Sequence, residues 1–384
     1  VPYTAFQHEG IEFIFMLTRD DVTIPDAREV YASIAGSGVR HVGCKDVGLA
    51  PDDLAALIDH LFAEMQIDPQ WSIRHPRGFT WWAGTLAQHV WAEPAVQDMG
   101  IEIARVHVQT DLLRNFTPHA NSLLRLGITT GFATLSGLLV GEGIVRSAAS
   151  IFVHNETLPM WKRLLSIASL LQVSEAHIMV EMLASLTNSL PAISSHPTSG
   201  LRNNYDDMLN VIRDVYSPMG RGRSWFIGTG FRDAEQRASP AVSLLTNADE
   251  HGLTAEFPFG DQTALFRMMT DVQHPRLGSG LMLVLALPIS YSNQPVPEIA
   301  LQMNQRELSE FTRNPFLGSW CPHPSIPNTL SFVSFFPNVC SLPGLPATLL
   351  HYWAGKSRWM LESVMRWDYQ ESVLRARPSM FWSS

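Results

Sequence analysis

The chain has 384 residues, 46% of them hydrophobic and 16% charged, which is typical of a globular protein and long enough for two or three domains. Its longest apolar stretches, such as residues 277–289, are interrupted by Gly, Ser or Pro well before the roughly 20 residues that a membrane-spanning helix needs. The formal net charge of −9 argues against binding to nucleic acid or to an anionic membrane, because contacts with phosphate groups need clustered Lys and Arg.

The three cysteines, Cys44, Cys321 and Cys340, lack the paired spacing of a metal site. An odd number of cysteines fits a reducing compartment, and no secretory signal is visible at the start of the sequence. We therefore expect a cytoplasmic protein without a metal ion or another cofactor.

The first predicted elements form a βαβα segment. Residues 11–17 (IEFIFML) and 39–44 (VRHVGC) are apolar runs that indicate buried strands. Pro25 begins a helix between them, and the sequence from Pro51 predicts a second helix to about residue 65. The strands start roughly 28 residues apart, which is the spacing of a parallel βαβ crossover.

The stretches that follow the two strands, residues 16–21 (MLTRDD) and 44–49 (CKDVGL), are similar to the first two βα units of a TIM-barrel protein. The resemblance covers about residues 11–65, and the rhythm of a barrel does not continue after them. It implies an enzyme with a ligand at the carboxyl ends of the strands.

Four charged residues occupy that position: Arg19, Asp20, Lys45 and Asp46. Lys and Arg could hold a small carboxylate or a phosphorylated metabolite, and a buried Lys45 could act as a Schiff-base nucleophile. The alternative interpretation is that all four are solvated loop residues. A further alternative is that the whole segment is a barrel remnant or a joined fragment.

A weak internal repeat extends from residue 78 to about residue 365. Four pairs of blocks recur in the same order: residues 78–80 with 252–254, 105–113 with 281–289, 121–136 with 296–311, and 147–152 with 331–336. An apolar helix is predicted after each final block, over residues 161–183 and 345–365. We infer that one module occurs twice.

The alignment of the blocks also bears on candidate chemistry. His107 and Asp111 lie four residues apart on a predicted strand, so they share one face. Because the repeat places Leu283 and Leu287 opposite them, we interpret them as structural polar residues. No histidine shows the paired helical spacing of a zinc site.

Each module reads as strands, helix, strand and helix, which predicts an α+β fold with a mainly antiparallel sheet. This pattern over residues 78–365 resembles a tandem YbjN or type III secretion chaperone-like unit, including the related TY-Chap group. The resemblance implies that the two units pair as a pseudo-dimer and bind peptide or protein, with no catalytic residues. We expect the following division: residues 1–70, the βαβα segment; 71–193, the first unit; 194–250, a connector with a helix at 205–216; and 251–384, the second unit.

The sequence thus supports two functions. The first is a chaperone-like module that binds a protein or peptide partner and neither nucleic acid nor membrane, with self-association left open. The alternative is a TIM-barrel-like enzyme that acts on a small carboxylate or phosphorylated metabolite.

Overall fold

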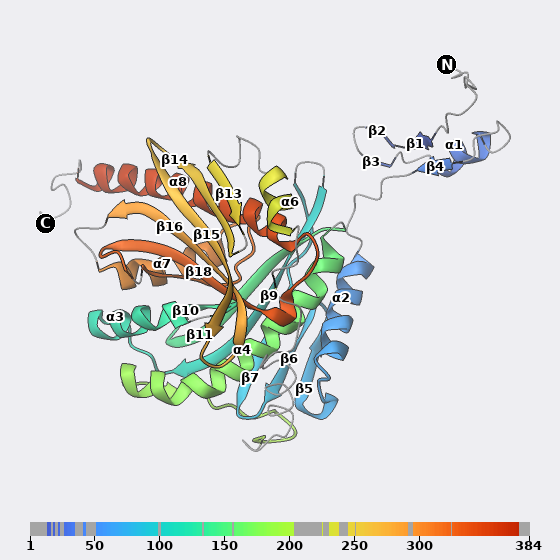
Figure 1. The fold of residues 1–384 in the computed structure, drawn as a ribbon. Helices are drawn as coiled ribbons and strands as arrows, with labels where there is room; N and C mark the ends of the chain where they lie inside the picture. Colours follow the sequence, from blue (N-terminus) through green and yellow to red (C-terminus); the bar gives the residue numbers. More distant parts are fainter. Residues whose placement is uncertain are drawn as a thin grey trace, which may run out of the picture.

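The computed structural model describes most of the chain from residue 51 onward and parts of the segment before it (Figure 1). The described residues are 14–16, 18–19, 22–23, 27–34, 41–43, 51–98, 101–132, 134–155, 157–202, 225, 230–237, 245–249, 251–290, 295–323 and 325–375.

From residue 51 the chain forms two units, each with one antiparallel sheet. The elements of the first unit are, in chain order, α2 (Pro51–Glu64), β5 (Ser72–His75), β6 (Gly78–Ala83), β7 (Leu86–Ala92), β9 (Ile101–Arg114), α3 (Ala120–Thr129), β10 (Gly137–Gly141), β11 (Ile144–Val153) and α4 (Leu158–Thr187). In the sheet the strands are ordered β5-β6-β7-β9-β11-β10, and two short strands, β8 (Val96–Asp98) and β12 (Leu190–Pro191), also pair with β9.

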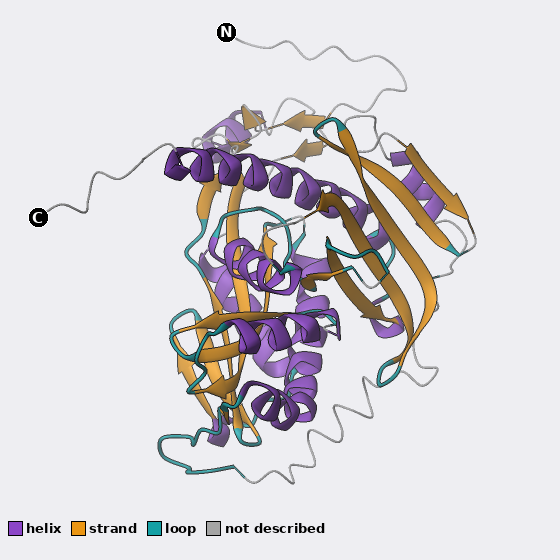
Figure 2. Ribbon diagram, turned by 90° about the vertical axis from the view of Figure 1, so that its left-hand side faces the viewer, coloured by secondary structure: helices purple, strands orange, loops and turns teal. Residues whose placement is uncertain are grey.

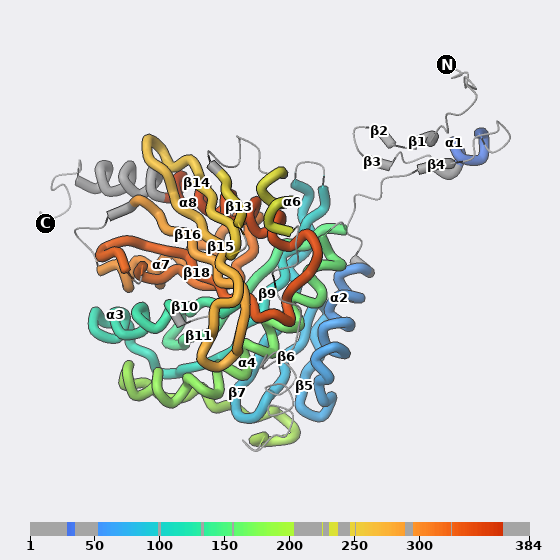
Figure 3. The backbone as a smooth tube through the Cα atoms, in the orientation of Figure 1, coloured from blue at the N-terminus to red at the C-terminus, as the bar shows by residue number. Residues whose placement is uncertain are grey.

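The second unit repeats this plan. Its elements are α6 (Gly230–Arg237), β13 (Leu245–Asp249), β14 (Gly252–Phe259), β15 (Gln262–His274), β16 (Gly278–Ser290), α7 (Val296–Ser309), β17 (Ser319–Pro322), β18 (Thr329–Pro337) and α8 (Leu345–Arg375). The strand order β13-β14-β15-β16-β18-β17 matches the first sheet strand for strand. The predicted α+β fold with two antiparallel-sheet-plus-helix units is confirmed, and Figure 3 shows the earlier unit in blue to green and the later one in yellow to red.

Local sequence explains where several of these elements begin and end. Proline in the first turn starts α2, α4 and α7, where its missing N–H costs no hydrogen bond. Asn188 ends α4 in the left-handed conformation (φ 53°), a conformation that Asn tolerates better than most residues. Glu142 and Gly143 (φ 53° and 72°) form the two-residue turn between β10 and β11, and two positive φ values in succession suit the twist of a hairpin.

Helices cover one face of each sheet, which we call the inner face (Figure 2). In the first unit α2 and α4 pack on β6, β7 and β9; in the second, α6 and α8 pack on β14, and α8 also contacts β16. The inner faces and their helices share one continuous hydrophobic core that includes Trp161 of α4 and Trp353 of α8. The opposite face of each sheet is called the outer face below.

Among the described helices, α4 alone is long and apolar enough to cross a membrane by length and composition. However, 67% of its apolar window is buried inside the protein, which is consistent with the core helix of a soluble protein. Its Trp161 side chain is fully buried and contacts the ring of Tyr352 in α8.

The two units pair through equivalent elements. α3 packs against α7, and β10 lies near β17. Gly127 of α3 approaches α7 so closely that a Cβ atom would overlap the carbonyl oxygen of Pro297. Ser150 of β11 and Phe316 of the second unit exchange two backbone hydrogen bonds, of 3.0 and 2.7 Å.

The structure corrects the residue alignment of the repeat. Gly78 and Gly252 are equivalent as predicted: each opens its strand, and a Cβ atom on either would overlap the carbonyl oxygen opposite, of Val90 or Met268. Across the next strand pair, however, Val90 is opposite Val108 whereas Met268 is opposite Leu283.

The predicted alignment of residues 105–113 with 281–289 is therefore wrong by one residue. His107 corresponds to Met282 and Asp111 to Ala286, and the last strand block is also wrong by one residue, in the opposite direction. Side chains of a strand alternate between its two faces. The predicted alignment therefore compared outer-face residues of the first unit with inner-face residues of the second. Leu283 and Leu287 are core residues of the inner face and have no bearing on His107 and Asp111.

The segment before residue 51 contains a parallel strand pair, as its sequence predicts. β1 (Ile14–Met16) pairs in parallel with β4 (His41–Gly43), and α1 (Ala27–Ile34) lies between them in the chain. A short antiparallel pair, β2 (Thr18–Arg19) with β3 (Val22–Thr23), interrupts the crossover. Within the described residues no third strand joins β1 and β4, so the barrel rhythm stops there.

The helix from Pro51 packs on the first sheet and on α4, although the sequence places it with the βαβα segment. Its apolar stripe, which includes Leu57 and Leu61, is fully buried in the shared core. α6 holds the equivalent place in the second unit, inside the predicted connector. The predicted connector helix at residues 205–216 lies outside the described residues.

Candidate binding surface

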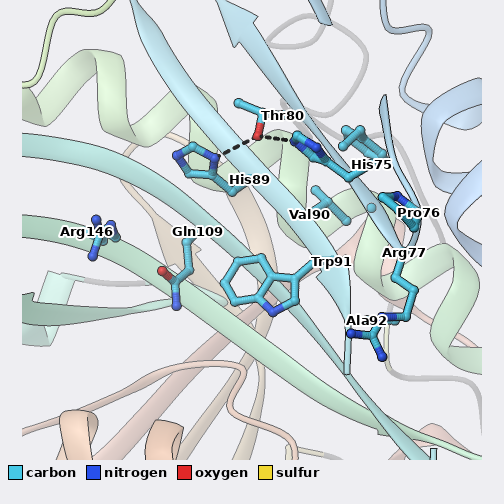
Figure 4. A pocket seen from close by; sticks show the side chains of 12 residues that line it. His75, Pro76, Arg77, Thr80, His89, Val90, Trp91, Ala92, Gln109 and Arg146 are labelled. Atoms are coloured by element: carbon cyan, nitrogen blue, oxygen red, sulfur yellow. Dashed lines mark hydrogen bonds between the residues drawn. The ribbon is translucent and has the colours of Figure 1, made fainter. Parts of the chain in front are cut away.

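The outer face of the first sheet is open over much of its area. The carboxyl end of α7 and the residues after it cover one end of this face, where Phe311 packs against Phe152. The uncovered part contains a cavity of about 550 Å³ (Figure 4). Side chains from β5, β6, β7, β9 and β11 and from the turn before β6 line this cavity.

A chain of hydrogen bonds crosses five strands along this face. Thr80 Oγ1 lies 3.2 Å from His75 Nε2 and 2.9 Å from His89 Nδ1, and Figure 4 shows both contacts. His89 Nε2 lies 3.3 Å from Asp111 Oδ2, and Arg146 Nε donates to Asp111 Oδ1 at 2.8 Å.

One assignment of protons satisfies every contact in this chain. His89 donates through Nε2 to Asp111, so its Nδ1 accepts from the hydroxyl of Thr80. The Thr80 oxygen in turn accepts from Nε2 of His75. All donors therefore point toward Asp111, which alone receives two hydrogen bonds from cationic or titratable groups.

The ionisation of Asp111 follows from this arrangement. Burial by itself raises the pKa of the carboxyl group, but the hydrogen bonds and charges of His89 and Arg146 outweigh it, so the pKa lies below its usual value. Asp111 is therefore an anion at neutral pH, and its charge is already matched by Arg146.

A second polar pair lies next to the cavity. The ring of His107 stacks on Trp91, with centroids 4.7 Å apart and planes 13° apart, and His107 Nε2 lies 2.6 Å from Glu93 Oε1. Burial lowers the pKa of His107 and outweighs the opposing effect of Glu93. Trp91 is thereby held in one orientation while one side of its ring lines the cavity.

Two further side chains at the cavity have unused hydrogen-bonding capacity. Within the described residues, the guanidinium of Arg77 and the amide of Gln109 have no hydrogen-bond partner in the protein, and both line the cavity. The cavity thus presents donors that a bound molecule could satisfy.

The order hydroxyl, imidazole and carboxylate in Thr80, His89 and Asp111 is also that of an activated nucleophile. An acyl-transfer site needs, in addition, donors directed at an oxyanion. Thr80 lies in β6, which pairs with β5 on one side and with β7 on the other. The backbone N–H groups around Thr80 therefore take part in the hydrogen bonds of the sheet.

The equivalent surface of the second unit is less polar. Val284 and Ala286 stand where the first unit has Gln109 and Asp111, and Leu265, which lies beside them, is 41% exposed. The exposed Arg267 occupies the position of His89. Of the polar row, the second unit therefore keeps Thr254 and Arg267, at the positions of Thr80 and His89, and lacks the amide and the carboxylate.

None of the residues that the sequence nominated is among the described side chains that line this cavity. Arg19 belongs to β2, where only the backbone is described, and Asp20, Lys45 and Asp46 lie outside the described residues. Sequence reasoning did place His107 and Asp111 on one face of a strand, and the structure confirms this. It missed His75, Thr80, His89 and Arg146, although the alternation of polar residues at 105, 107, 109 and 111 was an available signal for a polar outer face.

Two further observations complete the picture of this surface. Across the described residues, no three His, Cys, Asp or Glu side chains are grouped so that they could hold a metal ion. Comparison with known protein families found no matching family model, and comparisons with curated proteins and with solved structures found no match.

Proposed function

We propose that this protein is a chaperone-like binding protein of the cytoplasm, which holds an extended peptide or protein segment on the outer face of its first sheet. The observation that carries this proposal is the open cavity with its unused donors, Arg77 and Gln109, on a surface that the second unit does not reproduce. The resemblance of residues 78–365 to YbjN and type III secretion chaperone-like units supports the same function. The proposal requires no cofactor, nucleic acid or membrane and leaves self-association open.

The shape of the surface favours an extended ligand over a small metabolite. The cavity extends across strands from β5 to β11, a width of about 19 Å. Small-molecule sites usually enclose most of their ligand, whereas this one lies open along a sheet. A peptide could lie along it and satisfy donors at both ends.

Site-specific crosslinking tests this proposal. A photoreactive amino acid is placed at Gln109, and in a separate control protein at Val284, the equivalent position of the second unit. Incubation with a random peptide library should give crosslinked peptides at position 109 at least several-fold above position 284. Equal yields at both positions, or none at 109, would refute the proposal.

The alternative is an enzyme acting on a small carboxylate or phosphorylated metabolite through Arg19, Asp20, Lys45 and Asp46. One observation favours it: Met16 is opposite Gly43 in the parallel pair, so the two strands end at the same edge. A metabolite that raises the melting temperature of the natural protein but not of Lys45→Ala would support this alternative, and a screen without such a compound would count against it.

A further inference from the structure

We infer that the ligand of the outer face is an acidic peptide, with two Asp or Glu side chains held near Arg77 and Arg146 and an apolar side chain between them on Trp91. This inference rests on the proposed peptide-binding function and specifies the chemistry that the surface recognises.

The charge around the cavity is the first argument. Arg77, Arg146 and two histidines line it, and none of its described lining residues is acidic. Asp111 borders it and binds Arg146 through Nε alone, so the terminal nitrogens of Arg146 and the guanidinium of Arg77 remain for a ligand. The chain as a whole carries a net charge of −9, so this surface has the opposite sign to most of the protein. Complementary charge steers a partner to such a surface and excludes partners of like charge.

The acidic groups nearest to Arg77 do not neutralise it. Glu93 is paired with His107 through the 2.6 Å contact. Glu102 lines a neighbouring cavity of about 380 Å³ together with Arg77, and within the described residues the two form no ion pair. The guanidinium of Arg77 is therefore available to an incoming carboxylate, for which its planar fork is well suited.

The separation of the two arginines is the second argument. Arg77 directly precedes β6, and Arg146 lies on β11, with β7 and β9 between these strands. Three strand spacings amount to about 14 Å. Arg146 is also opposite Asp111, whose row lies five residues, or about 17 Å, further along the sheet than Arg77, so the two backbones are about 22 Å apart and one carboxylate cannot bridge them. An extended peptide advances about 3.3 Å per residue, so acidic side chains roughly six residues apart would match the two arginines.

The position of Trp91 is the third argument. Trp91 lines the cavity, and its ring is fixed by the stacked His107. A rigid aromatic ring of this kind is a favourable platform for an apolar or aromatic side chain. The recognised sequence is therefore acidic at both ends and apolar in the middle.

Fluorescence anisotropy on the full chain tests the inference with three labelled ten-residue peptides. They differ only at two positions six residues apart on either side of a Phe, where they carry Glu, Gln or Lys. We expect the Glu peptide to bind at least about tenfold more tightly than the Gln peptide and to weaken as salt is added. The Lys peptide should bind weakest.

Substitutions then locate the effect. Arg77→Gln and Arg146→Gln should each weaken binding of the Glu peptide about three- to tenfold, and Arg146→Lys should restore most of the loss at that position. Arg267→Gln, on the outer face of the second unit, is the matched control and should change nothing. Circular dichroism melting of each variant shows whether the fold is intact.

The outcomes separate this inference from the proposed function. Crosslinking of peptides at Gln109 without any preference for the Glu peptide, or an equal loss in Arg267→Gln, would overturn the acidic ligand and leave peptide binding in place. Absence of binding by all three peptides together with absence of crosslinking at Gln109 would overturn both.

Discussion

Arg105 of the first sheet donates hydrogen bonds to the backbone carbonyl oxygens of Glu307 (3.0 Å) and Glu310 (3.1 Å) at the carboxyl end of α7 in the second unit. The carbonyl groups in the last turn of a helix lack partners within the helix, and a cation is favoured beside them. The Arg105 guanidinium also contacts Ser150 Oγ and lies over the ring of Phe152, 5.0 Å from its centre. This buried residue thus joins the two units at the edge of the open surface.

Substitution of Arg105 by Met should therefore destabilise the protein as a whole. It would leave two buried carbonyl groups without donors, and we expect the free energy of unfolding to fall by about 2–3 kcal/mol. Urea unfolding of the full chain measures this. Arg125→Met is the matched control, because Arg125 donates to the carbonyl oxygen of Leu186 at an exposed site, where the loss should stay below about 1 kcal/mol. Similar losses in both variants would show that Arg105 does not join the units.

Lys356 of α8 and Glu307 of α7 form a fully buried ion pair inside the second unit. Glu307 also accepts a hydrogen bond of 2.7 Å from Trp320 Nε1, and Lys356 Nζ lies 3.9 Å from the ring centre of Phe332. Burial lowers the pKa of Lys356, while Glu307 opposes this change. Each charge therefore depends on its partner.

A double-mutant cycle should reveal this dependence. Lys356→Met alone leaves the Glu307 carboxylate buried without its cation, and we expect a loss of about 3–5 kcal/mol in chemical unfolding. Lys356→Met combined with Glu307→Gln keeps an acceptor for Trp320 and removes the unpaired charge, so most of the loss should be recovered. Additive effects of the two changes would contradict a coupled pair.

The contact between α3 and α7 depends on the absence of a side chain at Gly127. Alanine there would gain helix propensity worth about 1 kcal/mol, but its Cβ would overlap the backbone of Pro297. We expect the overlap to dominate, with a net loss of about 1–3 kcal/mol measured by thermal unfolding. Gly131→Ala is the control four residues on, where the nearest atom to a new Cβ is 3.9 Å away, and it should be neutral or slightly stabilising. A stable Gly127→Ala protein would mean that the two helices can separate without cost.

Acid should destabilise the protein partly through His274. Burial and the charge of Arg276 lower the pKa of this residue to about 4, whereas in the unfolded chain it is near 6.5. Between these two values the unfolded state binds more protons than the folded state, so the free energy of unfolding falls as the pH falls from about 6.5 to 4. Burial lowers the pKa of His107 and His323 in the same direction.

The contribution of His274 can be isolated by substitution with Asn. His274 Nδ1 accepts the backbone N–H groups of Arg276 (3.3 Å) and Leu277 (3.2 Å), and an Asn side chain can accept similar bonds without titrating. Because the ring is partly exposed, we expect the variant to lose roughly 1–2 kcal/mol less stability between pH 6.5 and 4 than the natural protein. Urea unfolding at both pH values gives this difference, and an unchanged pH dependence would exclude His274 as its source.

The amino-acid sequence was sufficient to predict the order of most elements, although α6 and β13, inside the predicted connector, were missed. Apolar periodicity, proline at helix starts and turn residues between strands are local signals. They identified α4 and α8, the helices that follow the last strand of the first and of the second unit. The duplication was also recognisable, because equivalent strands and helices retained similar apolar patterns. The parallel pair of β1 and β4 followed from the length of the crossover between them.

The tertiary structure alone determined which side chains meet. Side-chain direction in a strand alternates with every residue, so an alignment wrong by one position placed His107 opposite a core leucine instead of the partly exposed Met282. Pairing between strands that are distant in the sequence sets this register, and no local pattern specifies it. The row from His75 to Arg146 arises from several strands in the same way, and its exposure depends on where the second unit stops covering the sheet.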